Sequence, residues 1–505
     1  MTRHLRATYR HPDARAYRAP GAPWDVPSLD ALLTTAAAGA SGPLVGDDTT
    51  DAALGGAALE DQVAAVAGGL RTEGVRRGDV VAWQAPNRSE VVLLYRACWR
   101  LGAVAAPLHH QAGSSDVDRM LGVLTPRLWL PLDEVTARVS AFAAGSDSVR
   151  VSAARPSDLA VALFTSGSTG EPKAVLHTHR ALSYKARTMA AVHGLTRADA
   201  VLMPAPMAHI SGLLNGVLVP GAVPMSARFM TRWDPEQGLK LIEHDRITFM
   251  IGPSTLFVSL LDAPRFTTER VESLRLVSSG TAGVSPAFID DASARLGAFV
   301  KRSYGSTEAP TVTTTHAGDP AGRGRDTDGR STGAAQLRIA DPVTGREQAP
   351  NDVGEVWLRG PELFAGYADV QQTRASVAGG WLRSGDLGTV DAAGWLTIVG
   401  RIKDVIIRGG ENIAAREVEA ILEAHPDVRH AVAVGKPDGR LGELVCVFVV
   451  ASQPFDLDDC RRWFEQRGVA RYKTPERLVQ VTHLPLLAAG KADRAALRDR
   501  AAALG

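Results

Sequence analysis

The chain has very little cysteine, no long apolar run and almost no net charge, and each shortage excludes a class of protein. Three cysteines in 505 residues, none in a CxxC spacing, support neither a disulfide framework nor a cysteine-based zinc site. No stretch approaches the roughly 18 apolar residues of a transmembrane helix, and the N-terminus lacks the apolar core of a secretory signal. The 56 basic and 55 acidic side chains argue against binding to nucleic acid or to a membrane surface. We therefore expect a cytoplasmic protein without integral membrane association. The arginine-rich N-terminus is expected to be an exposed arm.

Lysine is also scarce, because the chain contains only eight. Nearly all of its basic charge is arginine, whose rigid fork of donors differs from the compact, mobile charge of lysine. The positions that keep lysine are therefore of interest as candidate sites, although random placement explains a low count equally well.

What is present indicates an ordinary globular protein with more than one folding unit. The chain is 45% apolar, and its length exceeds a typical domain of about 150 residues. Short apolar strands that end in glycine or serine alternate with helical patterns, which predicts parallel α/β layers with ligands at the carboxyl ends of the strands. The predicted helices are 59–74, 89–101 and 235–244, and the predicted strands are 79–84, 102–108, 247–252, 274–280 and 297–305.

The pattern changes after residue 316. Residues 317–332 are rich in glycine, aspartate and arginine and predict a mobile loop, and residues 336–367 alternate like β structure. From about residue 403 the pattern predicts a separate small α/β domain. Its predicted helices are 415–424 and 457–467, and its predicted strands are 430–434 and 444–450.

The most informative stretch is residues 163–179, LFTSGSTGEPKAVLHTH. A buried strand leads into a loop of small and hydroxylated residues that ends at Lys173. Glycines let the backbone approach phosphate oxygens, hydroxyls add donors, and the lysine adds a mobile positive charge. The stretch is not a Walker loop, because Pro172 precedes the lysine and no serine or threonine follows it. A flexible surface linker is the alternative.

This stretch resembles the phosphate-binding signature of the adenylate-forming superfamily, which comprises acyl- and aryl-CoA synthetases, nonribosomal-peptide adenylation domains and firefly luciferase. Five further matches follow in the family's order, so that the resemblance covers about residues 160–495. They are PMAHISG (206–212), SYGSTE (303–308), GEVWLRGPELFAGY (354–367), SGDLG (384–388) joined to GRIKDVIIRGGENI (400–413), and GKADR (490–494).

The resemblance implies an α/β fold in two parts. A large N-terminal, multi-layer α/β domain with a β-barrel-like subdomain is expected over 1–400, and a small mobile C-terminal α+β domain over 401–505. It makes Lys403 the hinge about which the small domain swings after adenylation. The swing would replace the loop of the catalytic Lys491 with a thiol-acceptor tunnel formed by Gly409, Gly410 and Glu411.

The chemistry of individual residues agrees with this resemblance, although each has a plainer alternative. Glu308 can hold Mg²⁺ that bridges nucleotide phosphates, or it can belong to a helix N-cap. Tyr304 offers a flat face to adenine. Asp386 can accept hydrogen bonds from ribose hydroxyls with Arg401 as an added donor, or it can lie in a plain turn. His209 is expected to gate the passage between acyl pocket and nucleotide, or to be an ordinary buried histidine.

The resemblance assigns the following roles. The catalytic residues are Lys491, Thr307, Glu308 and His209, and the metal ligands are Glu308 and Thr165. The ATP or AMP contacts are Thr165, Ser166, Gly167, Ser168, Thr169, Gly170, Lys173, Gly280, Thr281, Tyr304, Gly305, Thr307, Asp386, Ile398 and Arg401. The acyl pocket comprises His209, Ser211, Gly212, Asn215, Ser279, Ala282 and Gly283.

The sequence departs from the family pattern at three places. Ala174 follows the phosphate-loop lysine where glycine is usual, and Ala489 replaces a serine or threonine before the C-terminal Gly-Lys. The segment 278–283 replaces a commoner Gly-Gly-Ala-Pro pattern. None of these changes removes a charged or metal-binding group, and the third suggests a pocket shaped for an unusual acid.

The predicted activity is therefore ATP-dependent activation of a carboxylic acid, with Mg²⁺, in two steps. The acid forms an acyl-adenylate and pyrophosphate, and coenzyme A then accepts the acyl group and releases AMP. The apolar segments 211–225 and 277–284 favour an aromatic, alicyclic or medium-chain acid. A carrier protein or an amine stays possible as the acceptor, and a non-catalytic nucleotide sensor is the rival of another class. The expected state is a monomer or a homodimer.

Overall fold

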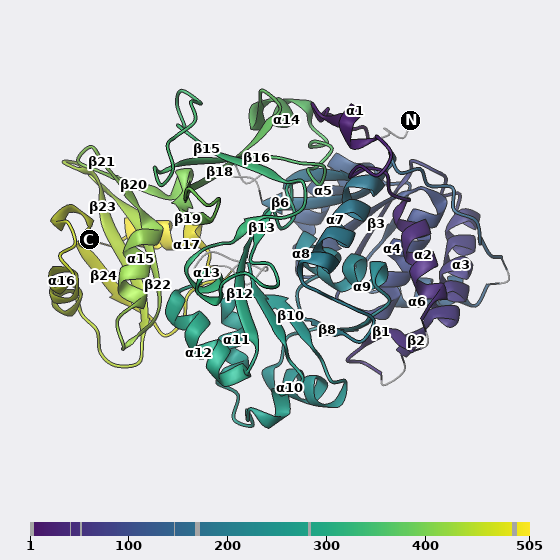
Figure 1. The fold of residues 1–505 in the computed structure, drawn as a ribbon, viewed down its shortest axis with the longest axis horizontal. Coiled ribbons are helices and arrows are strands. Elements are labelled where there is room, and N and C mark those ends of the chain that lie inside the picture. The colour runs from purple at the N-terminus through teal and green to yellow at the C-terminus, as the bar shows by residue number, and fades with distance from the viewer. Residues whose placement is uncertain are drawn as a thin grey trace.

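The computed structural model describes residues 5–40, 42–50, 53–145, 147–166, 172–280, 284–486 and 492–504. These residues form four β-sheets with their covering helices. Figure 1 shows three of them gathered in the larger part of the molecule, while the fourth lies at one end with α15, α16 and α17.

The first sheet has the strand order β5-β3-β4-β6-β7. Its strands β3, β4, β5 and β6 run parallel, and β7 returns antiparallel to β6. Valine, alanine and leucine fill the central strands because such strands are covered on both faces. The bounds are β3 (Val80–Ala85), β4 (Val104–His109), β5 (Leu128–Leu130), β6 (Leu159–Ser166) and β7 (Pro172–Thr178), with α3 (Gly56–Thr72), α4 (Ser89–Leu101), α5 (Ser114–Leu124) and α6 (Val135–Ala143).

The second sheet has nine strands in the order β14-β13-β12-β11-β10-β8-β9-β1-β2. Its middle strands from β12 to β1 are parallel, so that their carboxyl ends meet at one edge. The bounds are β1 (Pro43–Asp47), β2 (Ala53–Gly55), β8 (Ala200–Met203), β9 (Ser226–Phe229), β10 (Phe249–Gly252), β11 (Leu276–Ser279), β12 (Phe299–Tyr304), β13 (Thr313–Thr314) and β14 (Arg330–Ser331). Its helices are α7 (His179–Val192), α8 (Ile210–Gly212), α9 (Val219–Ala222), α10 (Pro235–His244), α11 (Ser254–Leu261) and α12 (Pro286–Leu296).

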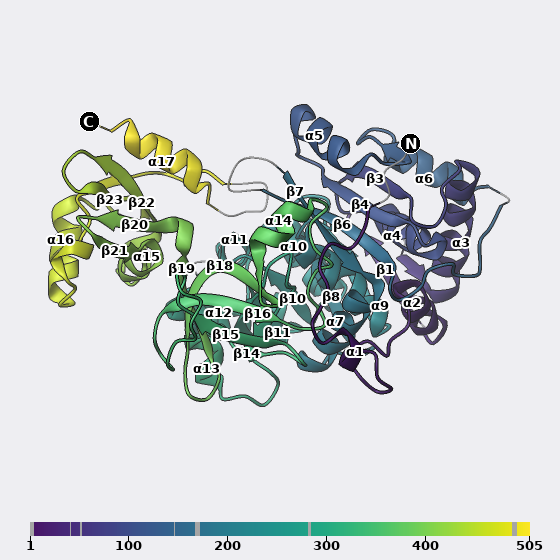
Figure 2. The same ribbon diagram turned by 90° about the horizontal axis from the view of Figure 1, so that it is seen from above.

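The third sheet is antiparallel and corresponds to the expected barrel-like subdomain. Its bounds are β15 (Gln336–Ala340), β16 (Gly354–Arg359), β17 (Val377–Ala378), β18 (Trp381–Val390) and β19 (Leu396–Arg401), and α14 (Val370–Ser376) accompanies them. The fourth sheet comprises β20 (Val405–Arg408), β21 (Glu411–Ala414), β22 (Val428–Asp438), β23 (Gly442–Ala451) and β24 (Arg477–Gln480), with α15 (Ala415–Glu423), α16 (Leu457–Gln466) and α17 (Arg494–Ala502). Figure 2 shows β19 leading from the third sheet to the fourth.

Helix bounds follow local capping chemistry closely. The Asp234 side chain accepts from the Gln237 N–H and Pro235 opens α10, which is the pairing that favours a helix start. The helix predicted at 235–244 has the bounds of α10, and the one predicted at 89–101 has those of α4. Gly102, at φ 70°, ends α4 in the left-handed conformation that glycine adopts without strain.

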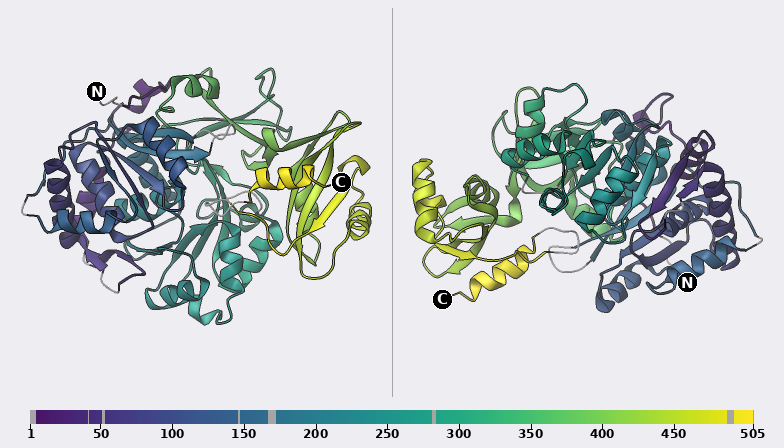
Figure 3. Two further views of the ribbon diagram at one scale, coloured as in Figure 1. Left: turned by 180° about the vertical axis from the view of Figure 1, so that it is seen from behind. Right: turned by 90° about the horizontal axis from the view of Figure 1, so that it is seen from below.

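Two sequence predictions need refinement. The arginines of the N-terminal arm, Arg6, Arg10, Arg15 and Arg18, are exposed as expected, but the arm is anchored by three aromatic residues. Tyr9, Tyr17 and Trp24 are each less than 10% exposed, and Trp24 donates through Nε1 to the Pro361 carbonyl at 2.8 Å. Figure 3 shows the purple N-terminal segment next to the green ribbon, and Asp13, which precedes α1 (Ala14–Tyr17), pairs with Arg359 of β16. The segment 317–332 is not simply a loop, because it contains α13 (Ala321–Asp326) and β14, whose backbone pairs with β13.

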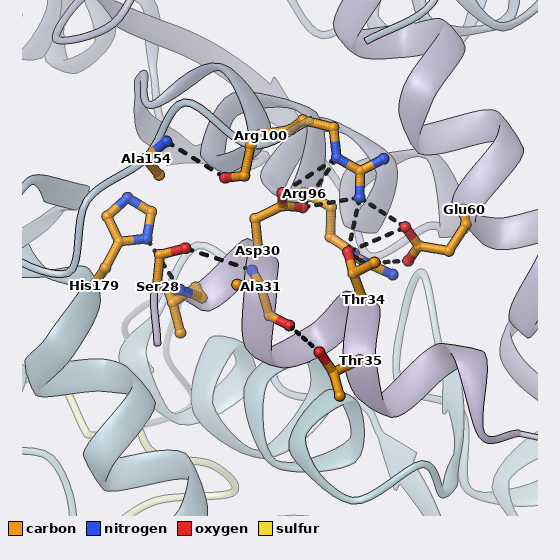
Figure 4. A network of polar contacts seen from close by, with 12 residues as sticks. Ser28, Asp30, Ala31, Thr34, Thr35, Glu60, Arg96, Arg100, Ala154 and His179 are labelled. Carbon is orange, nitrogen blue, oxygen red and sulfur yellow. Dashed lines mark hydrogen bonds and ion pairs between the residues drawn. The ribbon is translucent and has the colours of Figure 1, made fainter. Parts of the chain in front are cut away.

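A buried ionic network joins the three helices α2, α3 and α4 (Figure 4). Arg96 and Arg100 lie on α4, and both side chains are 2% exposed. Arg100 binds Asp30 of α2 (Leu29–Ala38) at 3.0 Å and Glu60 of α3 at 2.7 Å, and Arg96 also binds Glu60. A planar fork satisfies two carboxylates at once where a single lysine ammonium would not, which agrees with the preference of this chain for arginine.

Candidate active site

The carboxyl edge of the nine-stranded sheet carries one part of the predicted site. Tyr304 ends β12, Ser279 ends β11, and the loop after β8 leads to His209. Because β8, β10, β11 and β12 are parallel neighbours, the segments that follow them lie side by side, where α/β sheets bind ligands.

Three predicted nucleotide contacts form one hydrogen-bonded cluster. The Tyr304 hydroxyl donates to Asp386 Oδ2 at 2.8 Å, and Arg401 Nε lies 2.8 Å from Asp386 Oδ1. Asp386 and Arg401 are cross-strand partners on β18 and β19, and the carboxylate is 7% exposed. Burial, with the Asp386 charge beside it, raises the pKa of Tyr304 well above its usual value, so that the hydroxyl remains a donor. The cluster joins the second and third sheets at the site.

Ile398 lies next to this cluster on β19. Its backbone N–H donates to Asp328 Oδ2 at 2.8 Å, and its side chain packs against the apolar core of the third sheet. Burial raises the pKa of Asp328. Ile398 therefore supplies an apolar surface one strand away from the Asp386 carboxylate.

Glu308 is held by a tyrosine that the sequence reasoning did not single out. The Tyr367 hydroxyl donates to Glu308 Oε1 at 2.7 Å, and Lys173 Nζ lies 5.6 Å from the centre of the Tyr367 ring. Tyr367 forms a β-bridge with Val175 of β7, the strand on which Lys173 lies opposite Thr165. Tyr367, the last residue of the motif GEVWLRGPELFAGY, thereby connects the strands that flank the phosphate loop to the Glu308 carboxylate.

The carboxylate at this position fits Mg²⁺, which usually keeps several waters and takes one or two carboxylates beside substrate phosphates. Within the described ranges no group of three or more histidine, cysteine or acidic side chains forms a protein-only metal cage. A single carboxylate, Glu308, with the hydroxyl of Thr165 as the other predicted ligand, is a donor set compatible with a metal that arrives with a nucleotide.

We expect Tyr367→Phe to lower the adenylation rate about tenfold and to raise the Mg²⁺ concentration needed for half-maximal rate. The variant keeps the ring beside Lys173 but removes a hydrogen bond to a carboxylate, a class of bond worth about 1.5–3 kcal/mol. Tyr184→Phe is the control, because its hydroxyl accepts from the Ala334 N–H at 2.7 Å in another part of the fold. An Mg²⁺ titration of pyrophosphate exchange measures the effect. Equal Mg²⁺ requirements in the two variants would contradict the positioning role of Tyr367.

The backbone around Thr307 is fixed by a buried histidine. Nε2 of His177 lies 2.7 Å from the Thr307 carbonyl oxygen, and because a carbonyl only accepts, this nitrogen carries the proton. Burial lowers the pKa of His177 to about 4, so that the ring is neutral near pH 7. His177 follows the phosphate loop on β7. A polar residue directly after the apolar run at residues 174–176 was the signal in the sequence that could have identified it.

Gly305 is required by close packing in the same loop. A Cβ added there would lie 2.3 Å from the Thr311 backbone nitrogen and 2.9 Å from the Ala309 carbonyl oxygen, distances that real Cβ atoms do not show. A similar limit applies to Gly280, where a Cβ would lie 2.8 Å from Ser303 Oγ. The loop that presents Thr307 and Glu308 is therefore tightly packed against its own continuation.

His209 lies against His109, which in turn stacks on His110. The ring centres of His209 and His109 are 5.3 Å apart, and His109 stacks on His110 at 4.6 Å. Burial first, and the rings of His209 and His110 second, lower the pKa of His109 to about 4. His109 ends β4 of the first sheet, so that this contact joins the first and second sheets at the expected gate.

The expected acyl residues continue from His209 into helical structure. Ser211 and Gly212 belong to α8, and a Cβ on Gly212 would lie 2.2 Å from the Pro206 carbonyl oxygen. Asn215 lies in a π-helical stretch, Leu213–Leu218, that follows directly. Ser279 is 1% exposed at the end of β11.

The remaining predicted residues lie at the start of the fourth sheet. Lys403 is in the short 3₁₀ turn Ile402–Asp404 between β19 and β20. Gly409 and Gly410, at φ 57° and 91°, make the turn between β20 and β21, and Glu411 opens β21. Lys403 therefore lies in the linker between two sheets, and Gly409, Gly410 and Glu411 lie at the tip of a hairpin.

Eight predicted residues lie outside the described part of the chain, and Ser166 is described only as the last residue of β6. The eight are Gly167, Ser168, Thr169, Gly170, Thr281, Ala282, Gly283 and Lys491.

Comparison with known proteins agrees with the fold and with the expected family. Residues 44–368 match the family described as AMP-binding enzyme, and residues 417–491 match the AMP-binding enzyme C-terminal domain. The medium-chain fatty-acid–CoA ligase of Escherichia coli is 31% identical over 480 residues, covering 87% of this chain and 84% of that protein. A feruloyl-CoA synthase of an Amycolatopsis species is 32% identical over 473 residues, covering 89% and 94%. The ATP-bound structure of MatB from Rhodopseudomonas palustris matches with a TM-score of 0.87 at 26% identity, covering 94% and 99%.

The sheets, the two family matches and these relatives define a two-domain adenylate-forming ligase. The chain belongs to the AMP-binding enzyme family, as an AMP-forming acid–CoA ligase. The predicted family, fold class and enzyme class are thereby confirmed. Among the helices of the described ranges, none has the length and apolarity needed to cross a membrane.

Proposed function

We propose that this enzyme converts an apolar carboxylic acid, with ATP and CoA, into an acyl-CoA thioester. In the first half-reaction a carboxylate oxygen bonds to the α-phosphorus of ATP and the bond to pyrophosphate breaks. In the second, the CoA sulfur bonds to the acyl carbon, the thiol loses its proton, and AMP leaves. The observation that carries the proposal is the Tyr304–Asp386–Arg401 cluster, which joins the second and third sheets beside the Glu308 loop. Its carboxylate and donors suit a ribose, and the adjacent loop suits phosphates.

Each residue of the cluster would have a distinct role. Asp386 would accept from the ribose hydroxyls, with Tyr304 keeping its carboxylate in place and Arg401 supplying a neighbouring donor. Thr307 and Lys173 would bind phosphate oxygens, and Glu308 and Thr165 would hold Mg²⁺. When bound, the metal supplies positive charge that offsets the negative charge of the phosphates. Lys491 is assigned the developing charge at the α-phosphate, and no side-chain nucleophile is needed.

The acid is proposed to be aromatic, alicyclic or medium-chain and neutral apart from its carboxylate. Described residues 211–225 and 277–280 contain no lysine and no acidic side chain. The E. coli relative is named for medium-chain fatty acids and the Amycolatopsis relative for ferulate, which are acids of this kind.

The test is a pyrophosphate-exchange panel over diverse acids, repeated with CoA, a carrier protein and amines as acceptors. We expect exchange with apolar monocarboxylates and product only with CoA. Highest activity on a dicarboxylate or an α-amino acid would contradict the proposed acid. Acyl transfer to a carrier protein or an amine in preference to CoA would establish the alternative acceptor.

We also propose that the boundary between the domains lies at residues 400–401, with a hinge at Lys403. Arg494 Nε of α17 lies 3.7 Å from Asp404 Oδ2, and Arg498 binds the same carboxylate. These contacts attach α17, which begins three residues after Lys491, to the residue next to the proposed hinge. A rotation at Lys403 would therefore move the helix and the fourth sheet together.

Lys403→Pro is expected to slow CoA-dependent turnover at least tenfold while pyrophosphate exchange changes little. Proline fixes φ near −65° at the point where the backbone must rotate, so that one of the two conformations is lost. Lys403→Ala is the matched control, because it removes the same side chain and leaves the backbone free. Equal losses of both activities in the proline variant would show that residue 403 is not the hinge.

A further inference from the structure

Asn215 is a polar residue in an otherwise apolar, buried stretch. Asn215 is 1% exposed, and its neighbours Leu213, Leu214 and Val217 are all 4% exposed or less. Burying an amide in such surroundings is unfavourable unless its donors and acceptor find partners. Asn215 therefore requires a reason beyond packing.

The orientation of this amide is fixed by one hydrogen bond. Nδ2 of Asn215 donates to the Ser211 carbonyl oxygen at 3.0 Å. The reversed amide would place two acceptors face to face, so that the nitrogen must be the atom on this side. Oδ1 is then the other end, and among the described residues it has no hydrogen-bond partner although it is fully buried. Buried acceptors of this kind are rare in folded proteins.

Asn215 lies close to residues that the resemblance assigns to the acyl side of the site. Its Nδ2 bonds to the carbonyl of Ser211, which is four residues earlier and partly exposed. Both residues belong to the continuous helical stretch that begins after His209. Asn215 lies in a π-helical segment, and π-helical turns occur frequently at functional sites.

We propose that Oδ1 of Asn215 accepts a hydrogen bond from a neutral hydroxyl or ring N–H on the acid, at the end remote from the carboxylate. This inference rests on the proposed function and narrows its substrate class to apolar acids that carry one such donor. A cationic amine does not fit, because an amide oxygen supplies no formal charge to compensate a buried ammonium.

The test compares matched acids rather than single substrates. For each ring position, the hydroxy acid, the unsubstituted acid and the methoxy acid are compared by kcat/KM in pyrophosphate exchange. We expect the wild-type enzyme to prefer one hydroxy or N–H acid over both of its analogues by about 10- to 100-fold. In Asn215→Leu, which keeps the branched shape of the side chain but has no acceptor, that preference should fall to about one. Asn215→Ala serves as a second variant if the leucine variant fails to fold, as judged by thermal melting.

Asn87→Leu is the matched control. Asn87 is 5% exposed, but both ends of its amide are bonded, to the Ala205 carbonyl and to the Met207 N–H, each at 2.8 Å. Its replacement should lower the rates of all acids in proportion and leave the preference intact. Absence of any such preference in the wild type, or its persistence in both Asn215 variants, would overturn the inference while leaving the ligase activity in place. Absence of exchange with every acid would instead overturn the proposed function.

Discussion

Replacing Lys491 with alanine is expected to slow adenylation about 10²–10³-fold and to leave thioester formation from pre-made acyl-adenylate close to its normal rate. A cation that stabilises charge developing at the α-phosphate acts like an oxyanion-hole donor, whose loss costs about 2.7–4 kcal/mol. The thioester step would use the Gly409–Glu411 face of the small domain instead. The two half-reactions are measured separately, by pyrophosphate exchange and by CoA consumption.

Lys473→Ala is the control for that result. Lys473 belongs to the same small domain and pairs with Glu417 at 2.6 Å on a partly exposed surface, where an ion pair contributes about 0–1 kcal/mol. Neither half-reaction should change in this variant. A Lys491 variant that loses both half-reactions equally would indicate a structural lysine, and one that loses neither would indicate a solvated one.

Gly305→Ala is expected to lower adenylation by about 10²-fold or more. A Cβ at this position would lie 2.3 Å from a backbone nitrogen, so that the segment carrying Thr307 and Glu308 must shift, and a misplacement of about 1 Å can cost 10²-fold in rate. Circular dichroism and thermal melting should still show a folded protein, because the loop is short and lies at the end of β12.

Gly122→Ala provides the comparison. Gly122 lies within α5 with nothing within 4 Å of an added Cβ, and alanine in a helix is favoured over glycine by roughly 0.5–1 kcal/mol. This variant should keep full activity and melt at an equal or higher temperature. Normal adenylation by Gly305→Ala would show that the packing of the loop does not position its catalytic residues.

The parts of the site that are local in sequence could be predicted, and the contacts between distant segments could not. Capping by Asp234 and Pro235 fixes the start of α10 from neighbouring residues alone. The bond between Tyr367 and Glu308 spans 59 positions, and it depends on residues 365–367 pairing with β7. No periodicity signals such a pairing, because it is decided by how the third sheet packs on the first.

Tyr304 shows the same division within one residue. The motif predicted that Tyr304 ends a strand and that it belongs with the expected nucleotide contacts. Its hydroxyl bond to Asp386 crosses from the second sheet to the third, 82 positions away, and only the folded chain reveals it. The burial of Trp24 is a further case, since Arg180 lies 3.9 Å above the centre of that ring and Pro361 accepts its N–H.

The anchored N-terminal arm has a practical consequence for handling the protein. The Thr8 N–H donates to the Ala365 carbonyl at 2.8 Å, and its hydroxyl donates to the Tyr367 carbonyl at 2.7 Å, so that the arm contacts the residue whose hydroxyl binds Glu308. If Glu308 has the proposed role, an affinity tag or a truncation that pulls Thr8 away would act on this carboxylate through two bonds, and activity lost in this way would be mistaken for a poor substrate. Assays that compare acids should therefore carry any tag at the other end of the chain.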